Sequence, residues 1–373
     1  MGLFRVKVDS VGVGGSLGET QEIYMRHTAR KVFLLIALVL FLVAVMLLAT
    51  VVGAATVSVG DVLRVIAANV VPAYQGSVST LAETVVLQLR LPRILLALIT
   101  GIALGGAGAV MQGILRNPLV SPYTLGMSGG ASFGAALAIV LGTSFLGPYF
   151  NVVGTYLIAV NAFVFSILTI LLVYGISRLK GTAPETLILA GVALGYLFSA
   201  GVSALKYFSN NEALKELVVW LMGSLCGATW QQVGFLIPLV LACMVFLLRY
   251  AWDMNVLSAG EEVAVNLGVN VNRLRLIGLI VSVLAASATV AFTGVIGFIG
   301  LVSPHICRML IGSDNRFLIP CSCLMGAALL LVSDTLARTI MAPIEIPVGI
   351  ITSLIGAPFF LYLLIKKRKR WWS

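Results

Sequence analysis

The sequence predicts an all-α integral membrane protein with about ten transmembrane helices. Of its 373 residues, 60% are hydrophobic and only 10% are charged, and the mean hydropathy is +1.08. Soluble domains carry charge on roughly a quarter of their residues. In addition, apolar windows close to the roughly 20 residues that span a bilayer recur along the chain. A polytopic membrane protein, embedded in a lipid bilayer, satisfies all three observations.

Ten apolar windows, separated by proline, glycine and charge, are candidate spans. They lie near residues 32–52, 93–114, 123–141, 152–177, 186–206, 233–250, 275–293, 295–311, 317–337 and 348–365. An even number of spans places both termini on one side of the membrane. Of the 22 Lys and Arg residues from Arg26 onward, 16 fall on that side, including the basic tail 366–370, and six fall on the other. Basic residues concentrate in the cytosol, so we expect a multi-pass protein of the cell membrane with both termini cytosolic.

The same pattern accounts for the other gross features of the chain. The net charge of +10 reflects retained cytosolic Lys and Arg, and we expect the lipid bilayer rather than nucleic acid as the surrounding partner. Residues 1–30 are expected to be a cytosolic N-terminal extension and residues 31–373 a single transmembrane domain. The first apolar run exceeds a signal-peptide core, so it should be a retained span. The five cysteines have no metal-ligand spacing and are interpreted as small core residues.

A polar island, Met254–Arg275, interrupts the apolar pattern on the predicted cytosolic side. Ser258 and Glu261 have the spacing of a capping box, and Gly268 supplies a stop, which together predict a short helix over about 258–268 outside the membrane. Val263, Ala264 and Leu267 would share one face. Such a helix could press on a soluble partner, or it could be an ordered loop that shields helix ends. The residues of this island on which a contact would depend are Ser258, Gly260, Glu261, Glu262, Val263, Ala264, Leu267 and Gly268.

The second span carries small residues at every fourth position. Gly101, Gly105, Ala109 and Gly113 form a ridge along one helix face. Small residues let membrane helices approach closely where no hydrophobic force drives them together. The ridge predicts a central helix, which ends at the Asn117-Pro118 turn because proline cannot continue a helix.

From about Leu81 to Lys367 the chain resembles the FecCD-type permease subunits of type II ABC importers, which move iron–siderophores, haem and vitamin B12. Five ordered stretches carry the resemblance. They are LRLPRILLALITGIALGGAGAVMQGILRNPLVSPYTLGMSGGA from residue 89, LILAGVALG at 187–195, Trp220 with Met222-Gly223-Ser224, GFIGLVSPHICR at 297–308, and EIPVGIITSLIGAPFF at 345–360.

The resemblance implies a type II ABC importer permease fold and a set of partners. These are a second permease copy, so that the permease is a homodimer, two separate ATP-binding cassette subunits and an extracytoplasmic substrate-binding protein. The polar island then corresponds to the coupling helix that docks on the ATPase. The chain contains no GxxxxGK[ST] motif, so ATP-Mg is expected on the partner subunit, with no cofactor on this chain.

The resemblance also places a pathway between two permease copies. By position, Gln112, Thr186, Ser199 and Ser203 are candidate lining residues, although each could instead make a hydrogen bond between helices. The segment Thr182–Thr186 resembles the family's inner gate. Pro184 and Glu185 depart from the small hydroxyl residues found in some members of the family.

Three arginines on the predicted outer face, Arg90, Arg93 and Arg338, run against the positive-inside tendency. The resembling family offers arginines here to acidic residues of its binding protein, a task that suits bidentate guanidinium groups. The simpler interpretation pairs Arg338 with Asp334 at i, i+4 and lets Arg90 and Arg93 reach lipid headgroups.

No catalytic or metal-binding constellation is evident, and the chain is not expected to be an enzyme. Its two histidines are His27 in the cytosolic arm and His305, which we interpret as a packed or capping residue. The predicted function is import of a metal chelate, with an iron–siderophore first and haem or cobalamin next. The alternative is an ion-coupled secondary transporter, which would place ionisable residues at mid-membrane. Asp334 and Glu345, near outer span ends, are the only acidic candidates.

Overall fold

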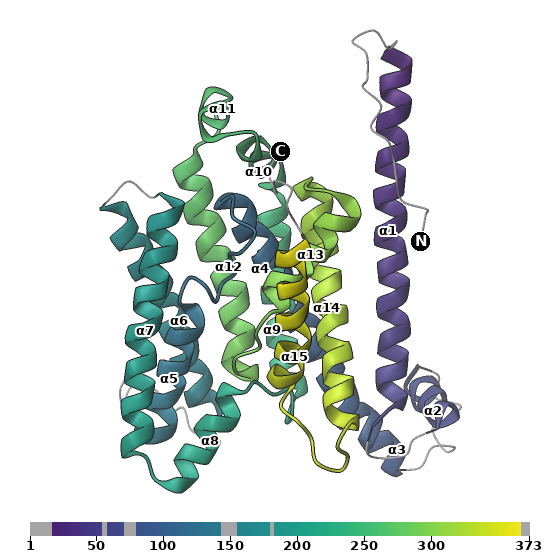
Figure 1. Ribbon diagram of the computed structural model, residues 1–373. Coiled ribbons are helices and arrows are strands. Elements are labelled where there is room, and N and C mark those ends of the chain that lie inside the picture. The colour runs from purple at the N-terminus through teal and green to yellow at the C-terminus, as the bar shows by residue number, and fades with distance from the viewer. Residues whose placement is uncertain (1–16, 54–57, 71–79, 143–154, 180–182, 367–373) are drawn as a thin grey trace.

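A computed structural model describes residues 17–53, 58–70, 80–142, 155–179 and 183–366 (Figure 1), and these residues are mostly helical, with no β-strand among them. The helices are α1 (Leu17–Val51), α2 (Val59–Val70), α3 (Thr80–Thr84), the π-helical η2 (Val85–Arg90), α4 (Leu91–Ile114), α5 (Met127–Leu141), α6 (Thr155–Arg178), α7 (Pro184–Phe208), α8 (Asn211–Leu221), α9 (Trp230–Leu248), α10 (Ala251–Ser258), α11 (Glu261–Asn266), α12 (Val271–Thr293), α13 (Ile299–Ile311), α14 (Asn315–Thr339) and α15 (Val348–Lys366).

Seven stretches of the described chain are helical, long and apolar enough to cross a membrane. They lie in α1, in the continuous run from α3 to α4, and in α6, α7, α9, α12 and α14. Three shorter apolar helices, Met127–Leu141, Ile299–Ile311 and Val348–Tyr362, occupy the remaining predicted positions. Seven helices of the described chain thus qualify as full spans by length, and with the three shorter apolar helices the predicted total of ten crossings stays a prediction. α5 and α13 are short because non-helical chain, residues 115–126 and 294–298, takes up part of each predicted window. Irregular backbone at membrane depth is tolerated where protein buries it.

The helix ends divide into two groups (Figure 1). The first residues of α1, the last residues of α15, and α10 and α11 lie at one end of the bundle, while α2, α3 and α8 lie at the other. This arrangement agrees with an even number of crossings. Residues 17–30 continue α1 without a break, so they form a helical extension of the first span, and residues 1–16 lie outside the described chain.

α4 lies at the centre of the bundle and is buried along almost its whole length. The small-residue ridge provides its contact with α14. A Cβ added at Gly101 would lie 2.5 Å from the Cα of Ala327, and one added at Gly105 would collide with the carbonyl oxygen of Ser322. The ridge does not extend evenly, because a Cβ at Gly113 would meet only ordinary contacts, 3.5 Å from Asn315 and Met254. The close approach of α4 and α14 is thus concentrated in the first half of the ridge.

Replacing Gly105 with Leu should therefore force α4 and α14 apart. Overpacking a core commonly costs 1–3 kcal/mol, and here the obstruction is backbone, so we expect a loss of at least about 2 kcal/mol and poor recovery of folded protein in detergent. The matched control is Gly113→Leu, which should cost less because the nearest atoms are flexible side chains. Thermal melting of both purified variants checks this. Equal melting of Gly105→Leu and the parent would show that the ridge does not set the packing.

Candidate functional site

A groove of about 520 Å³ runs along α5 and α7, bordered by Tyr123, Leu221 and Val295. It contains two of the predicted pathway residues, Ser199 and Ser203, whose side chains are exposed. The hydroxyl of Ser203 donates to the carbonyl oxygen of Ser199 at 2.9 Å. This bond lies within α7, so it is not the hydrogen bond between helices that was the alternative for Ser203. Apart from Tyr196 and the cationic Lys206, the remaining lining residues are small or weakly polar, namely Thr124, Gly126, Ser128, Gly129, Ser132, Gly191, Val192, Gly195 and Val202.

Glycines bring the walls of this groove together. An added Cβ at Gly191 would lie 2.6 Å from the Cα of Leu125, and one at Gly129 would lie 3.2 Å from the Cα of Gly195. Gly126 has a positive φ of 82° and begins α5 from a left-handed conformation, which suits glycine. Backbone atoms therefore form much of the groove floor. Most of the polar side chains that line the groove carry hydroxyl groups, and Lys206 is the one cation among the lining residues.

Other predicted pathway residues lie elsewhere. Gln112 is fully buried in α4, and neither its Nε2 nor its Oε1 has a hydrogen-bond partner among the described residues. Thr182 lies outside the described residues. Pro184 is the first residue of α7, Glu185 is exposed and Thr186 is half-buried; none of the three lines the groove. The predicted inner-gate role remains a prediction.

The polar island forms two short helices rather than one. Ser258 ends α10 and donates its hydroxyl to the carbonyl oxygen of Asn255 at 2.6 Å, so it is not the N-cap of the following helix. α11 begins at Glu261 after Gly260, whose φ of 140° allows the turn between the helices, and no side chain caps it. The capping-box prediction was wrong because Ser258 instead closes the preceding turn, an equally local bond that the spacing does not exclude. Gly268, with a φ of 85°, follows the end of α11 as expected.

α11 exposes an apolar patch at its tip. Val263, Val265 and Leu267 are 44%, 58% and 68% exposed, and the helix stands at the end of the bundle (Figure 1). Ala264, predicted to share a face with Val263 and Leu267, is instead fully buried against the rest of the chain. Val263 and Leu267, four positions apart, lie on the same side of this short helix, so two of the three exposed apolar side chains are neighbours.

Two polar links tie this region to the long helices. The Glu261 carboxylate accepts two hydrogen bonds from the buried Arg275 of α12, at 3.2 and 2.7 Å. From α10, Asn255 donates to Asp314 at 2.8 Å and accepts from the backbone N–H of Asn315 at 2.8 Å, at the start of α14. These contacts join α11 to α12 and α10 to the start of α14.

Asp314 is the centre of the second link. Its carboxylate accepts from Arg316 at 2.6 Å and lies 3.5 Å from the Nζ of Lys31 in α1. Partial burial raises the pKa of Asp314, but the hydrogen bonds from Arg316 and Asn255 outweigh it and lower the pKa to about 2. The Arg316 guanidinium also stacks 4.1 Å from the ring centre of Trp252 in α10. Sequence reasoning missed this cluster, and its only local signal was the polar Asp-Asn-Arg run between two apolar windows.

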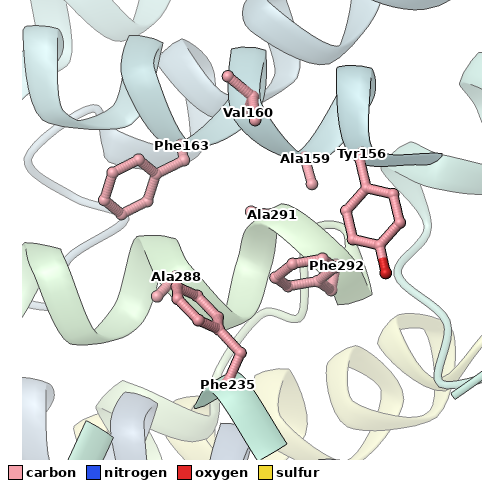
Figure 2. A pocket seen from close by; sticks show the side chains of 8 residues that line it. All are labelled: Tyr156, Ala159, Val160, Phe163, Phe235, Ala288, Ala291 and Phe292. Carbon is pink, nitrogen blue, oxygen red and sulfur yellow. The ribbon is translucent and has the colours of Figure 1, made fainter. Parts of the chain in front are cut away.

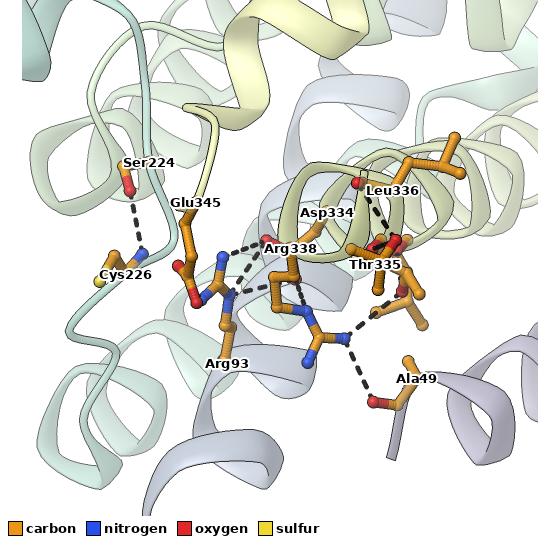
Figure 3. Close-up of polar contacts among 11 residues, drawn as sticks. Ala49, Arg93, Ser224, Cys226, Asp334, Thr335, Leu336, Arg338 and Glu345 are labelled. Atoms are coloured by element: carbon orange, nitrogen blue, oxygen red, sulfur yellow. Dashed lines mark hydrogen bonds and ion pairs between the residues drawn. The ribbon is translucent and has the colours of Figure 1, made fainter. Parts of the chain in front are cut away.

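At the opposite end of the bundle, charged residues form an internal network (Figure 3). Arg93 of α4 contacts Asp334 of α14 through Nη2 at 2.9 Å and Glu345, in the α14–α15 connection, through Nη1 at 2.7 Å. Arg338 completes it, with its Nε 3.3 Å from Asp334, which is wholly buried. The i, i+4 pairing of Arg338 with Asp334 is thus present, as part of a larger cluster.

Two arginines of this region bind the end of α1. Arg338 donates to the carbonyl oxygen of Ala49 at 3.1 Å, and Arg90 donates to those of Thr50 and Val51 at 2.7 and 3.0 Å. Carbonyl groups of a last helical turn lack intrahelical partners and carry partial negative charge, which suits cations. Arg90 and Arg338 are 4% and 5% exposed, and the Arg93 side chain 11%. These arginines are not displayed for a binding protein or for lipid headgroups in this structure, so the surface presentation predicted for them does not hold.

No group of three or more His, Cys, Asp or Glu side chains among the described residues could hold a metal ion. His305 is 1% exposed in α13 and His27 is exposed on α1. Four cysteines, Cys243, Cys307, Cys321 and Cys323, are buried as small core residues, while Cys226 is exposed.

The seven long apolar helices, packed around the central α4, are those of a multi-pass membrane protein. The chain matches the FecCD transport family over residues 39–366 and belongs to that family. It is similar to an ABC transporter permease protein of Methanocaldococcus jannaschii, with 44% identity over 93% of this chain and 98% of the relative. It is also 43% identical to the hemin transport system permease protein of Yersinia pestis, over 76% of this chain and 84% of that protein.

Among solved structures, the chain is similar to one described as an inward-facing conformation of a metal-chelate type ABC transporter. The two share 36% identity with a TM-score of 0.77, covering 90% of this chain and 99% of that one. Further relatives are named as import permeases for Fe(3+)-citrate, cobalamin and molybdate.

Proposed function

We propose that this chain is the transmembrane permease subunit of a binding-protein-dependent ABC importer for a metal chelate. An iron–siderophore is the first candidate cargo, and haem or cobalamin come next. The observation that carries the proposal is membership of the FecCD family over most of the chain, together with relatives named for hemin, Fe(3+)-citrate and cobalamin. One relative is named for molybdate import, so the proposed cargo class is not limited to iron compounds.

The groove along α5 and α7 is suited to form one half of the transport pathway. Its hydroxyl and glycine lining offers few charges to hold a bulky chelate, so a cargo could pass without being trapped. Ser199 and Ser203 are exposed, and a second permease copy placed over α7 would enclose the groove as the other half of a homodimeric channel. Specificity would then come from the extracytoplasmic binding protein.

We base the proposed docking site for the ATPase subunit on the exposed apolar side chains of Val263, Val265 and Leu267. An apolar anchor surrounded by polar residues is the usual centre of a protein interface. In this arrangement ATP-Mg binds to the partner, two ATPase copies serve two permeases, and the α10–α11 end faces the cytosol.

The ion-coupled alternative is not supported. The one fully buried acidic side chain in the described chain, Asp334, lies between Arg93 and Arg338, and Glu345 also pairs with Arg93. Carboxylates neutralised in this way are structural ion pairs, whereas a coupling carboxylate must gain and lose an ion during transport.

Uptake measured in proteoliposomes tests the proposal. The permease, its ATPase and its binding protein should accumulate a radiolabelled ferric siderophore only when ATP reaches the ATPase face, and collapse of ion gradients by ionophores should leave uptake unchanged. An ATPase variant that cannot hydrolyse ATP is the control, and unlabelled haem and cobalamin serve as competitors. Uptake driven by an ion gradient without ATP would overturn the importer assignment.

A further inference from the structure

A wholly apolar hollow of about 290 Å³ lies between α6, α9 and α12, on helices other than the two that form the weakly polar groove. Figure 2 shows four aromatic side chains placed around small alanines. The lining residues are Tyr156, Ala159, Val160, Phe163, Phe235, Ala288, Ala291 and Phe292.

The hollow exists because small residues form its floor. Ala159, Ala288 and Ala291 are 3%, 2% and 5% exposed and let α6 and α12 pack closely. Larger rings stand around them, and the ring of Tyr156 meets that of Phe292 edge to face at 6.4 Å. Tyr156 is 47% exposed and Phe235, on α9, is 58% exposed, so the hollow opens to the outside of the chain.

The depth of the hollow follows from the residues that begin α6 and α9. Tyr156 donates its hydroxyl to Gln231 at 2.9 Å, and the Nε1 of Trp230 donates to the carbonyl oxygen of Leu87. Tyr and Trp gather where a membrane meets water, with their polar tips in the wet layer. Phe163 lies two helical turns further along α6, which is about 10 Å deeper at 1.5 Å per residue. The hollow therefore extends from the headgroup level into the upper acyl region, at the end of the bundle opposite α11.

We propose that this hollow binds one acyl chain of a phospholipid from the leaflet at that end, with the lipid headgroup beside the Tyr156–Gln231 pair. The phase that meets an open apolar surface at this depth is lipid, and a polar or charged cargo would find no hydrogen-bonding side chain in the lining other than the Tyr156 hydroxyl, which already donates to Gln231. An acyl chain in the hollow would make the van der Waals contacts that the small alanine side chains do not make between α6, α9 and α12. The lipid would act as a packing element joining α6, α9 and α12, independently of what the permease transports.

A photoreactive phosphatidylcholine, with a diazirine in the upper part of one acyl chain, tests the site in proteoliposomes containing the full-length permease. Peptide mapping should show labelling concentrated on the lining segments of α6, α9 and α12. Ala288→Phe fills the hollow, and we expect this labelling to fall to the level of ordinary lipid-facing peptides. Ala242→Phe is the matched control, since Ala242 is exposed on α9 outside the hollow, and it should leave labelling unchanged.

The labelling pattern of the parent protein tests the lipid site even if Ala288→Phe folds poorly. Ala159→Leu is a second variant that fills the hollow with a smaller side chain. Parent labelling no stronger at the hollow than around Ala242 would overturn the proposal, as would labelling that survives both filling variants. Crosslinks from the hollow to a second copy of the chain would identify a protein occupant instead and also reject it. None of these outcomes bears on ATP-driven uptake, which is measured separately.

Discussion

Replacing Arg93 with Met is expected to destabilise the permease by about 3 kcal/mol, since removing one partner of a buried ion pair leaves the other charge uncompensated. Asp334 is wholly buried, and Arg93 supplies its shortest contact, at 2.9 Å, while also holding Glu345 of the α14–α15 connection. Arg338 alone would remain beside Asp334, at 3.3 Å. Thermal melting of the purified variant in detergent measures the loss.

The control for this change is Arg64→Met on α2. Arg64 also pairs with an aspartate, Asp61, but its side chain is 62% exposed and the contact is 3.7 Å, so we expect a change below about 1 kcal/mol. The double variant Arg93→Met with Asp334→Leu should recover only part of the loss, because it removes the closest pair of charges but leaves the buried Arg338 without its carboxylate partner. Equal melting of Arg93→Met and Arg64→Met would show that the internal network does not hold the helices.

The same contacts decide what charge reversal at Arg90 and Arg93 should do. If Arg90 and Arg93 were displayed to a binding protein, changing both to Glu would abolish capture and leave the membrane fold intact. Arg90 instead holds the last carbonyl groups of α1, and Arg93 holds α14. Reversal should therefore reduce folded protein before any partner is added.

Much of the fold could be predicted from local pattern. Apart from the start of α1, the apolar windows place the long helices within a few residues; α7, for example, was expected over 186–206 and spans Pro184–Phe208. The glycine spacing likewise anticipates the close approach at Gly101 and Gly105. Both signals lie within one helix, where period and residue size are directly readable.

The features that were missed depend on residues far apart in the chain. Arg93 and Asp334 are 241 positions apart, and Asn255 and Asp314 are 59 apart. No local spacing predicts such pairs, so the outer arginines looked available for docking. The Ser258 prediction failed for a different reason, since a serine between two short helices can cap the second or bond back into the first, and only the turn at Gly260 decides.

Replacing Val263 or Leu267 with Asp is expected to reduce uptake at least about tenfold, because losing an apolar interface anchor commonly costs 2 kcal/mol or more. Both side chains are exposed on α11, so the change puts a charge into the proposed ATPase contact without opening a core. Ala264→Asp tests the stability of α11 rather than the proposed contact with the ATPase. Ala264 is fully buried, so a charge there should destabilise α11 itself.

The matched control is Val59→Asp. Val59 is 59% exposed, at the opposite end of the bundle on α2, and the same substitution there should leave uptake near the parental rate. Melting temperatures close to the parent for Val263→Asp and Val59→Asp would establish that neither change acts through folding. Any difference in uptake between them then reports on position alone.

The ratio of ATP hydrolysed to chelate imported, measured in proteoliposomes of the complete transporter, tests most directly whether α11 couples the ATPase to the spans. Glu261 with Arg275 and Asn255 with Asp314 connect α11 and α10 to α12 and α14. For Leu267→Asp we expect import to be lost while the ATPase either continues to hydrolyse ATP or no longer associates with the permease. A parental ratio and a parental import rate in Leu267→Asp would contradict the coupling role of α11.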